Sequence, residues 1–213
     1  MNVQDLEVEI LRWQASCVRK LALEDGEVAR IRLLPVKLAA GHPWLRYGQH
    51  WSSGEPLTCP ETTQSQVVDK TGPCPLCAVL DDPWHELVLR VSYLLYCLVL
   101  ERAGSSTAPD ALLRLHQCWM PAKVFALVSK LVLNPYRIFS WDDDGYDVCL
   151  KKQDRKLLVT LGPRSTWRVP EAAREQLLAA AASPKRRVRW HDLSYQALML
   201  GAKEGAREYE REE

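Results

Sequence analysis

The sequence predicts a mainly β protein with helices, in which a small barrel carries an inserted metal-binding loop and is followed by a C-terminal helical segment. Short β-rich segments bounded by turn residues dominate the middle of the chain, a pattern typical of barrels and sandwiches. One helix is expected between these strands and another after them, whereas a parallel α/β sheet would alternate strands and helices throughout. A polar stretch after the first strand of the core collects cysteines, which usually lie in apolar cores, so this stretch predicts an insertion.

The global composition describes an ordinary globular protein of one or two domains. The chain has 213 residues, of which 47% are hydrophobic and 26% are charged, close to the averages of globular proteins. Its formal net charge of +1 provides no general attraction for a polyanion, although a local basic groove is compatible with it. Histone-like binding is therefore not expected.

The N-terminus and the apolar segments predict a cytoplasmic protein without a membrane anchor. Residues 1–13, MNVQDLEVEILRW, carry acids where a secretory signal needs a basic head and an apolar run. The apolar runs are too short or too interrupted to span a bilayer. In a reducing compartment, clustered cysteines indicate metal binding or catalysis rather than disulfides, and the odd count of seven agrees with that.

The first half of the chain is expected to contain a lead segment at residues 1–24 and the start of a core that spans 25–170. The lead segment is compatible with a helix or a strand. Residues 28–33 alternate apolar and basic side chains, which predicts a half-buried strand. The insertion is expected at 42–85, and residues 88–101 form a β-rich run with the length of a bent barrel strand.

The second half is expected to hold a helix, one or two hairpins and a terminal helical segment. Residues 117–133 resemble a strand end that leads into a helix with a proline near its start. The pair Asp144 and Gly145 and the polar stretch at 153–156 are turn signals for hairpins. Residues 171–213 should begin with a helix and continue through a basic segment into a charged tail.

Three cysteines and one histidine share the polar stretch with the spacing H-x8-C-x14-C-x2-C; they are His50, Cys59, Cys74 and Cys77. Zinc prefers four nitrogen or sulfur ligands at tetrahedral corners, and two intervening residues let the last two sulfurs face one point. A loop this polar cannot form a hydrophobic core of its own. A structural metal with an apparent binding energy of about 10–16 kcal/mol would explain how the loop is ordered. We therefore expect one structural zinc ion per chain, with no open coordination position.

The histidine is the ligand for which the sequence leaves alternatives, because His42 and His85 are close to the same loop. His50 is preferred, since a ligand just before the loop would close it onto the two last cysteines. A thioredoxin-like redox pair is the weaker interpretation of CPLC, because that motif requires a strand before it and a helix after it.

One histidine, a later CP pair and GPCPLC lie between RIRLLPV and VSYLLYCLVLE, and this arrangement resembles the single-stranded DNA-binding proteins of T-even-type bacteriophages. In that family a strand ends in an "RFLP"-like segment, a His-Cys-Cys-Cys zinc subdomain follows, and a Ser-Tyr strand enters the barrel. The stretch WDDDGYDVCLKK is similar to the family's "GYD" hairpin. The resemblance covers roughly residues 28–170, and the zinc segment is its most specific part.

The resemblance implies an OB-fold barrel with the zinc subdomain as an insertion. It further implies a groove that binds single-stranded DNA without sequence preference, in DNA replication, recombination or repair, with no catalytic residues. The four residues named above would be the zinc ligands. The positions that match the family's DNA contacts are Arg30, Arg32, Arg90, Tyr93, Tyr146, Lys151 and Lys152.

The aromatic composition is suited to a single-strand binder. Eight tryptophans and seven tyrosines against two phenylalanines favour side chains that tolerate water at an open groove. The stretch WLRYGQHW interleaves Trp44, Arg46, Tyr47 and Trp51, which is the composition of a platform on which bases stack. The alternative is that these aromatic side chains pack around the zinc loop.

Both ends of the chain depart from the family's pattern. Residues 1–27 hold six acids against three bases, where the family has a basic arm that mediates cooperative binding. Residues 203–213 hold five glutamates against three bases, a diluted form of the acidic tail through which the family recruits replication proteins. The basic stretch at 184–191 would either extend the DNA-binding track or protect an exposed edge strand.

Two further function classes are compatible with the sequence. One is a zinc-ribbon adaptor that binds a replication or transcription protein through the metal loop, and the other is an RNA-binding OB protein. An enzyme is the least supported class. The run Asp142–Asp144 precedes a glycine and indicates a turn rather than a Mg²⁺-dependent nuclease, and Cys118 follows His116 without a supporting acid.

Overall fold

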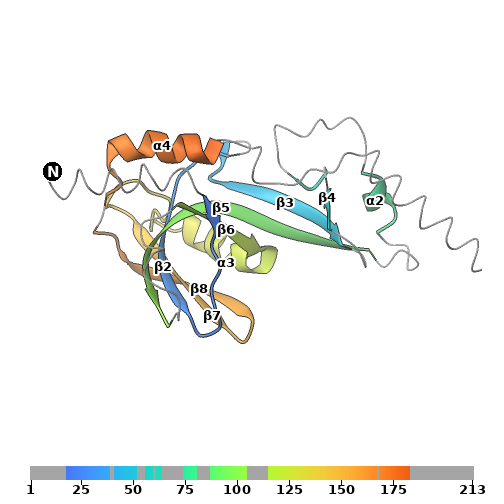
Figure 1. Cartoon of the computed structure of the whole chain (residues 1–213), viewed down its shortest axis with the longest axis horizontal. Helices are drawn as coiled ribbons and strands as arrows, with labels where there is room; N and C mark the ends of the chain where they lie inside the picture. The colour runs from blue at the N-terminus through green and yellow to red at the C-terminus, as the bar shows by residue number, and fades with distance from the viewer. Residues whose placement is uncertain are drawn as a thin grey trace, which may run out of the picture. The chain divides into compact units, whose positions relative to one another are not determined.

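The computed structural model of the chain describes residues 18–38, 41–51, 56–59, 61–63, 74–80, 87–104, 115–166 and 168–182. Most of the predicted lead segment, His85, and the basic segment and charged tail from residue 183 onward lie outside these ranges. The elements in chain order (Figure 1) are β1 (Arg19–Lys20), β2 (Val28–Leu33), β3 (Trp44–Trp51), β4 (Leu57–Cys59), α2 (Pro75–Ala78), β5 (Val88–Ala103), β6 (Leu115–Pro121), α3 (Ala122–Val132), β7 (Tyr146–Gln153), β8 (Lys156–Arg164) and α4 (Glu171–Ala182).

The chain divides into two compact units, which are described separately here. The described residues of 18–45 and 93–182 form the first, which we call the sheet unit, and those of 46–92 form the second, the metal unit. The metal unit overlaps the predicted insertion at 42–85.

The protein is mainly β, as the sequence predicts, and its strands form a mixed sheet. The strand order is β1-β6-β5-β2-β7-β8, and off this path β3 pairs with β4 and β5. The pair β1–β6 is parallel, whereas β2 runs antiparallel to both of its neighbours and β7 antiparallel to β8. Among the described strands no ladder joins the two ends of this order. The sheet is therefore open, and the predicted OB barrel is not confirmed.

The strand predicted at residues 28–33 is β2, which lies between β5 and β7 in the sheet. Ala29, Ile31 and Leu33 are fully buried, in agreement with the alternating sequence pattern. The pairing with β5 shifts register between Arg30 and Ile31, as in a β-bulge. Beyond this shift the alternation ends, because Arg32 is buried as completely as its apolar neighbours.

The helix predicted within residues 117–133 follows β6 directly as α3, with Pro121 in the N-cap position. Proline has no backbone N–H for a sheet ladder, and it is compatible with the start of a helix. Phe125 and Val128 are the buried residues of α3 and join the larger apolar cluster of the sheet unit.

The hairpin predicted around residues 153–156 connects β7 and β8. Asp154 and Arg155 have φ values of 52° and 61°, and two positive φ values are characteristic of a type I′ hairpin turn. The second predicted hairpin, at Asp144 and Gly145, is wrong. These residues form a turn before β7, and the described residues just before them contain no strand. Glycine is required at position 145, because a Cβ at this position would lie 2.3 Å from the carbonyl oxygen of Arg137.

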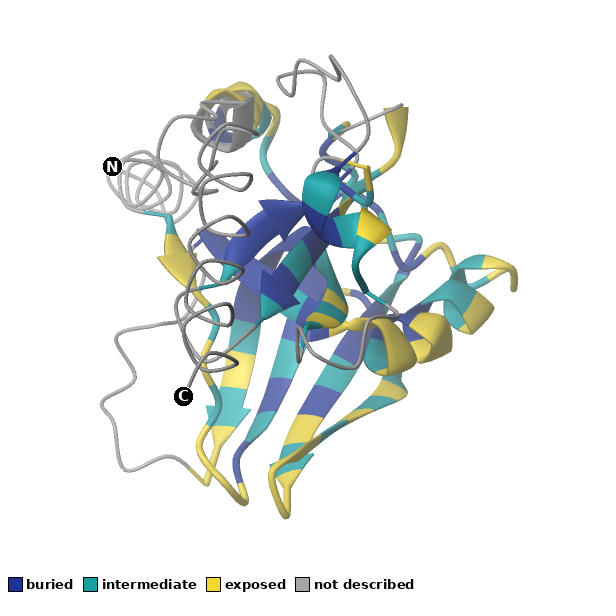
Figure 2. Cartoon of the chain, turned by 90° about the vertical axis from the view of Figure 1, so that its right-hand side faces the viewer, coloured by how far each residue is buried: buried dark blue, intermediate teal, exposed yellow. Residues whose placement is uncertain are grey.

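Figure 2 shows that buried residues lie along the central strands of the sheet unit, and the apolar ones among them form its core. The predicted terminal helix is α4, whose Ala173 and Leu177 pack into a second apolar cluster with Leu34 and Leu98. Within the described ranges, no helix combines the length and the apolar character that crossing a membrane requires.

Candidate metal centre

The four predicted metal ligands converge on one point in the metal unit. The ligand atoms of His50, Cys59, Cys74 and Cys77 all lie within 4.8 Å of one another. The two Sγ atoms of Cys59 and Cys77 are 3.4 Å apart. The Nε2 atom of His50 lies 3.4 Å from Cys74 Sγ and 3.5 Å from Cys77 Sγ. The predicted set of four residues is confirmed as a cluster that could hold a metal ion.

Of the two alternative histidines, His42 is exposed and its ring stacks on Trp44, with centroids 4.8 Å apart and planes inclined by 12°. It is not a member of the cluster. His50, by contrast, is only 1% exposed, which agrees with a ligand that faces inward.

Two short antiparallel strands position the first two candidate ligands. In the β3–β4 ladder Gly48 lies opposite Cys59, and His50 lies opposite Leu57. Cys59 and His50 are therefore two residues apart in register, so that their side chains emerge on the same face of the hairpin.

Glycine is required opposite Cys59 because the neighbouring chain approaches closely. A Cβ at Gly48 would lie 2.5 Å from Cβ of Thr62 and 3.2 Å from Cβ of Cys59. The contact is held by Thr63, whose hydroxyl accepts a hydrogen bond from Gly48 N at 3.1 Å. Thr63 N in turn donates to the Cys59 carbonyl at 3.0 Å. Thr62 and Thr63 thus pack against β3 at Gly48.

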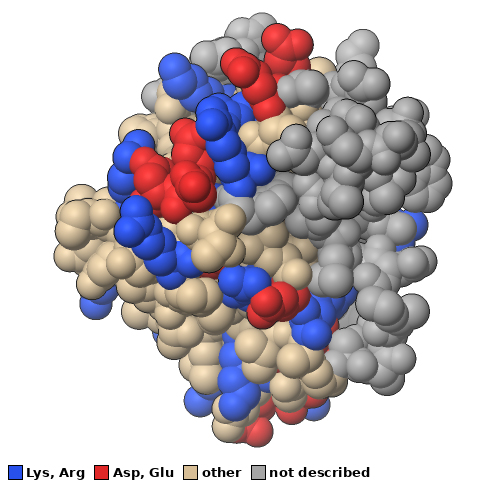
Figure 3. Space-filling view, turned by 90° about the vertical axis from the view of Figure 1, so that its left-hand side faces the viewer, with Lys and Arg blue, Asp and Glu red and all other residues tan. Residues whose placement is uncertain are grey.

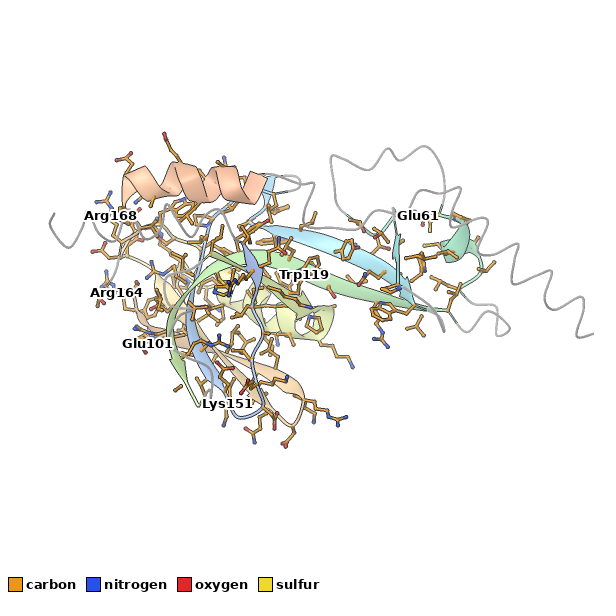
Figure 4. The ribbon with its side chains drawn as sticks, in the orientation of Figure 1. Glu61, Glu101, Trp119, Lys151, Arg164 and Arg168 are labelled. Carbon is orange, nitrogen blue, oxygen red and sulfur yellow. The ribbon has the colours of Figure 1, made fainter. Side chains whose placement is uncertain are left out.

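The other two cysteines belong to the short helix α2, which forms the tight knuckle expected from CPLC. Cys74 is the N-cap residue with extended dihedral angles, and Pro75 begins the helix. Cys77 N donates to the Cys74 carbonyl at 3.1 Å, which turns both sulfurs toward the same side. Glu61, which lies near α2 in Figure 4, accepts a hydrogen bond from Cys74 N at 2.5 Å.

The proximity of the sulfurs shifts their acidity in opposite directions. The hydrogen bond from Cys74 lowers the pKa of Cys59 to about 3. The same hydrogen bond and burial raise the pKa of Cys74 far above its usual range. Burial and then the hydrogen bond with Cys59 raise the pKa of Cys77 to about 12. Metal ligation requires the thiols to lose their protons, and a bound cation would stabilise the thiolates that burial disfavours.

The donor set and its size fit a tetrahedral metal. Ligand–metal distances of about 2.3 Å for sulfur and about 2.0 Å for nitrogen place neighbouring ligand atoms roughly 3.5–3.8 Å apart at tetrahedral corners, and the separations of 3.4–3.5 Å above are close to this. Three thiols and an imidazole are also the ligands of structural zinc sites. All four positions would come from the protein, so the centre is suited to holding the fold together rather than to binding a substrate.

The predicted DNA contacts on β2 have a different role from the one expected. Arg32 is 0% exposed, and its Nε donates to Asp147 Oδ1 at 2.8 Å while Nη1 donates to the Asp142 carbonyl at 2.9 Å. Arg30 donates to Asp147 Oδ2 at 3.3 Å and forms an ion pair with Glu101. The prediction that Arg32 contacts DNA is corrected, because this guanidinium neutralises a buried carboxylate and has no access to a phosphate.

The prediction that Tyr47 stacks on a base is also corrected, because this side chain is only 5% exposed. Its hydroxyl forms a 2.6 Å hydrogen bond with Thr58 Oγ1, and burial raises the pKa of Tyr47. The neighbouring Trp51 is half-buried. The guanidinium of Arg90 lies over the Trp51 ring, 4.8 Å from its centroid, so these two predicted residues form a cation–π pair.

The sheet unit contains a connected set of rings that we call the aromatic series: His42, Trp44, Phe125 and Tyr93. Tyr93 stacks on Phe125 with centroids 3.8 Å apart and an interplanar angle of 8°. Trp44 lies 5.4 Å from Phe125 and stacks on His42. His42 is exposed, and Trp44 and Tyr93 are half-buried. The sequence did not indicate that Phe125 belongs to this series, because the position of Phe125 in the helical pattern predicts only a core residue.

The remaining predicted contacts are dispersed. Tyr146 is half-buried and packs edge-on against Tyr136, with centroids 5.4 Å apart. Lys152 donates from Nζ to the Leu23 carbonyl at 2.9 Å. Lys151, labelled in Figure 4, and Arg46 are exposed. On the face drawn in Figure 3, basic and acidic side chains are interspersed rather than segregated.

Comparison of the chain with protein-family models and with curated proteins finds no match.

Proposed function

We propose that this chain is a non-enzymatic protein that binds single-stranded DNA without sequence preference and acts in DNA replication, recombination or repair. Contacts with the phosphates and stacking of bases on aromatic side chains would provide the affinity. A structural zinc ion would hold the metal unit in its folded form.

The aromatic series is the observation that carries this proposal. Proteins that bind single strands combine cations with exposed aromatic rings, and each stacked base contributes about 1–3 kcal/mol. In the aromatic series the rings of His42 and Trp44 stack and are accessible to solvent to different degrees. A base could continue this stack from the exposed His42 ring. Exposed cations such as Lys151 are available for phosphates.

The arrangement of strands supports an OB-like core. An OB fold is a five-stranded, partly open Greek-key barrel. Here five strands follow the order β6-β5-β2-β7-β8, and α3 connects β6 to β7. A barrel of this kind would need β6 and β8 to approach each other, and α3 packs against both of these strands.

Zinc is the metal that suits the donor set best. His50, Cys59, Cys74 and Cys77 would hold it, since thiolates and imidazole prefer zinc over hard cations such as Mg²⁺ or Ca²⁺. The bound metal would supply structural order. The chain's own residues would prepare its site through the β3–β4 register and the α2 knuckle.

The direct test is a fluorescence-anisotropy titration of labelled oligo-dT with the full chain at several salt concentrations, with metal content measured on the same sample. We expect about one zinc per chain and binding that weakens with salt, with a log–log slope of about −0.7 per contacted phosphate. Absence of binding at low salt, or a slope of zero, would refute the proposal. An RNA oligomer of equal length in the same titration separates a DNA binder from an RNA binder.

The variant Trp44→Leu removes the ring on which His42 stacks, so His42 should no longer hold a base, and oligo-dT binding should weaken by about fivefold, the lower limit expected for one stacked base. A matched control is Trp141→Leu, since Trp141 is also half-buried but packs in the second apolar cluster of the sheet unit. Equal losses for the two variants would mean that the effect arises from folding rather than from stacking.

The ion pairs of β2 favour a second candidate, a zinc-containing adaptor that binds another protein. Arg30 and Arg32 are engaged by acidic residues of the same chain, which leaves fewer cations for a polyanion than the sequence indicated. One zinc per chain without any binding of oligo-dT in the titration would support this candidate.

A further inference from the structure

The sheet unit contains a concave site that we call the basic pocket, with a cavity volume of about 280 Å³. Its lining comes from β1 and the residues after it, from β6, and from the β7–β8 hairpin. The residues on which the inference depends are Lys20, Trp119, Lys152 and Arg155, with Leu21 and Leu150 among the apolar side chains of its wall. Three of these four residues, Lys20, Trp119 and Arg155, are absent from the DNA contacts predicted from sequence.

Backbone hydrogen bonds fix the walls of the basic pocket. Leu21 N donates to the Gln117 carbonyl at 2.8 Å, which continues the β1–β6 ladder. On another side Gly26 N donates to the Lys152 carbonyl at 2.8 Å, and Lys152 N donates to the Glu27 carbonyl at 3.0 Å. The pocket is therefore formed by paired backbone segments and is present before any ligand binds.

All charged side chains that line the basic pocket are basic. Lys20, Lys152 and Arg155 line it, and no lining residue is acidic. Lys152 Nζ is held by the Leu23 carbonyl at 2.9 Å, which keeps its charge at the wall. Lys20 and Arg155 are exposed. The surroundings of β2 are different, because its arginines are paired with carboxylates.

Two nearby acidic side chains, those of Glu27 and Asp25, form other interactions. The carboxylate of Glu27 is fully buried and forms an ion pair with Arg102. Asp25 Oδ1 accepts a hydrogen bond from the backbone N of Arg155 at 3.2 Å, an interaction that helps to fix the hairpin turn. The charged residues that line the basic pocket are therefore all cations, and these would attract an anion.

A flat apolar surface lies beside these cations. Trp119 is half-buried and lines the pocket together with leucine side chains such as Leu21 and Leu150; Figure 4 labels it on β6. Indole rings stack with nucleobases, and cations contact the adjoining phosphates. The volume is near the lower end of small-ligand sites, which begin at about 300 Å³, and suits one nucleotide rather than a longer segment.

We infer that the basic pocket binds one phosphate-bearing nucleotide of the single strand, with the phosphate on Lys20 and Arg155 and the base against Trp119. This inference rests on the proposed function, since it assigns one contact site of the bound strand. A free mononucleotide carries the same phosphate and base as a nucleotide of the strand, so the experiment compares a free mononucleotide with an oligonucleotide.

The test is isothermal titration calorimetry of the full chain with four ligands: thymidine monophosphate, thymidine, inorganic phosphate and oligo-dT. Thymidine monophosphate should bind more tightly than either thymidine or phosphate, because only it occupies both parts of the pocket. The double variant Lys20→Gln/Arg155→Gln should lose mononucleotide binding. It should also flatten the salt dependence of oligo-dT binding by about 0.7 in log–log slope, the value for one phosphate contact.

The matched control is Lys123→Gln/Lys156→Gln, which removes two exposed cations that do not line the pocket. This variant should bind thymidine monophosphate like the unmodified chain. Equal losses in the two double variants would overturn the inference, since a general loss of charge would then explain both. Metal content and thermal unfolding of each variant verify that it is folded.

A second measurement is independent of any variant. Oligo-dT carrying bromodeoxyuridine is crosslinked to the unmodified chain by ultraviolet light, and the modified peptides are identified by mass spectrometry. A crosslink in the β6 peptide that contains Trp119 would support the inference. Crosslinks confined to other peptides would overturn it while leaving the proposed function intact.

The outcomes also separate the two proposals. Oligo-dT binding that the pocket variants leave unchanged would refute the basic pocket and retain the DNA-binding function. Binding of thymidine monophosphate in the pocket without binding of oligo-dT would refute the DNA-binding function and, with it, the assignment of the pocket to a bound strand. The pocket would then be a site for a free mononucleotide.

Discussion

The sheet unit and the metal unit of this chain are stabilised by different means. Thirteen buried residues form the larger apolar cluster of the sheet unit, and a second cluster includes residues of α4. Within the described part of the metal unit, the apolar cluster has four buried residues, Leu57, Cys59, Cys74 and Leu76, and two of these are candidate metal ligands. Apolar burial stabilises by about 25 cal/mol per Å², so among the described residues this contribution is smaller in the metal unit than in the sheet unit.

The two units should therefore respond to different perturbations. Loss of a metal ligand should unfold the metal unit and leave the sheet unit folded. A cavity in the core of the sheet unit should destabilise the sheet unit and leave metal binding unchanged.

The variant Cys74→Ser removes one candidate ligand, and we expect it to abolish stoichiometric zinc binding. Structural zinc contributes roughly 10–16 kcal/mol of apparent binding energy, so β4 and α2 should lose their protection against hydrogen exchange while β2 and β7 keep theirs. Metal analysis and hydrogen exchange by mass spectrometry measure the two effects. The control is Cys149→Ser, which changes a half-buried thiol of β7 and should retain the metal. Full protection of α2 without metal would contradict the comparison.

The variant Asp147→Asn tests the buried ion pair of the sheet unit. It leaves the charge of Arg32, which is 0% exposed, without its carboxylate partner. Breaking a buried pair in this way costs about 3–5 kcal/mol, which chemical denaturation would measure as a lower free energy of unfolding. Asp143→Asn, at an exposed position of the turn before β7, should change it by less than about 0.5 kcal/mol. Similar values for the two variants would show that Arg32 does not depend on Asp147.

The variant Leu95→Ala creates a cavity in the larger apolar cluster of the sheet unit, where Leu95 is fully buried. Truncations of this type lower the free energy of unfolding by about 2–5 kcal/mol. The metal content should remain at the value of the unmodified chain. Loss of metal in this variant would show that the two units do not respond separately.

The variant Gly48→Ala tests the close packing beside Cys59. The added Cβ would lie 2.5 Å from Cβ of Thr62, and overpacking of this kind costs about 1–3 kcal/mol. We expect weaker zinc retention in a competition with a chelator. The double variant Gly48→Ala/Thr62→Gly removes the clashing atom and should restore part of the loss. No difference between the single and double variants would mean that the glycine is not needed for packing.

The smallest expected effect concerns Asp142, whose pKa is lowered mainly by its hydrogen bond with Arg174. A carboxylate with a lowered pKa in the folded state stabilises the fold above its unfolded-state pKa, and this stabilisation is lost as the pH falls through the folded-state value. Arg174→Gln should therefore raise the pKa of Asp142 and shift this loss to higher pH. An NMR titration of the Asp142 carboxyl group measures the shift, and Arg168→Gln should produce a smaller one. An unchanged pKa in Arg174→Gln would exclude Arg174 as the cause.

Local pattern predicted most of the secondary structure. The alternation in residues 28–33 corresponds to β2, the β-rich run at 88–101 lies within β5, and the proline-led helices correspond to α3 and α4. These segments were predictable because hydrophobic periodicity and turn residues act over a few positions. The turn at Asp144 and Gly145 was misassigned, since a turn residue signals a change of direction but does not show whether a strand precedes it.

The candidate ligand set was also predictable, because metal sites impose a narrow choice of residue types and spacings. What the sequence determined by itself is therefore the strand-rich class of the fold and the identity of His50, Cys59, Cys74 and Cys77 as a cluster. Only the tertiary structure decided that Arg32 and Tyr47 are buried, that Phe125 connects Trp44 to Tyr93, and that Lys20 and Arg155 share a pocket. The physical reason is that burial and proximity of side chains depend on which distant segments cover each face, and no local pattern contains that information.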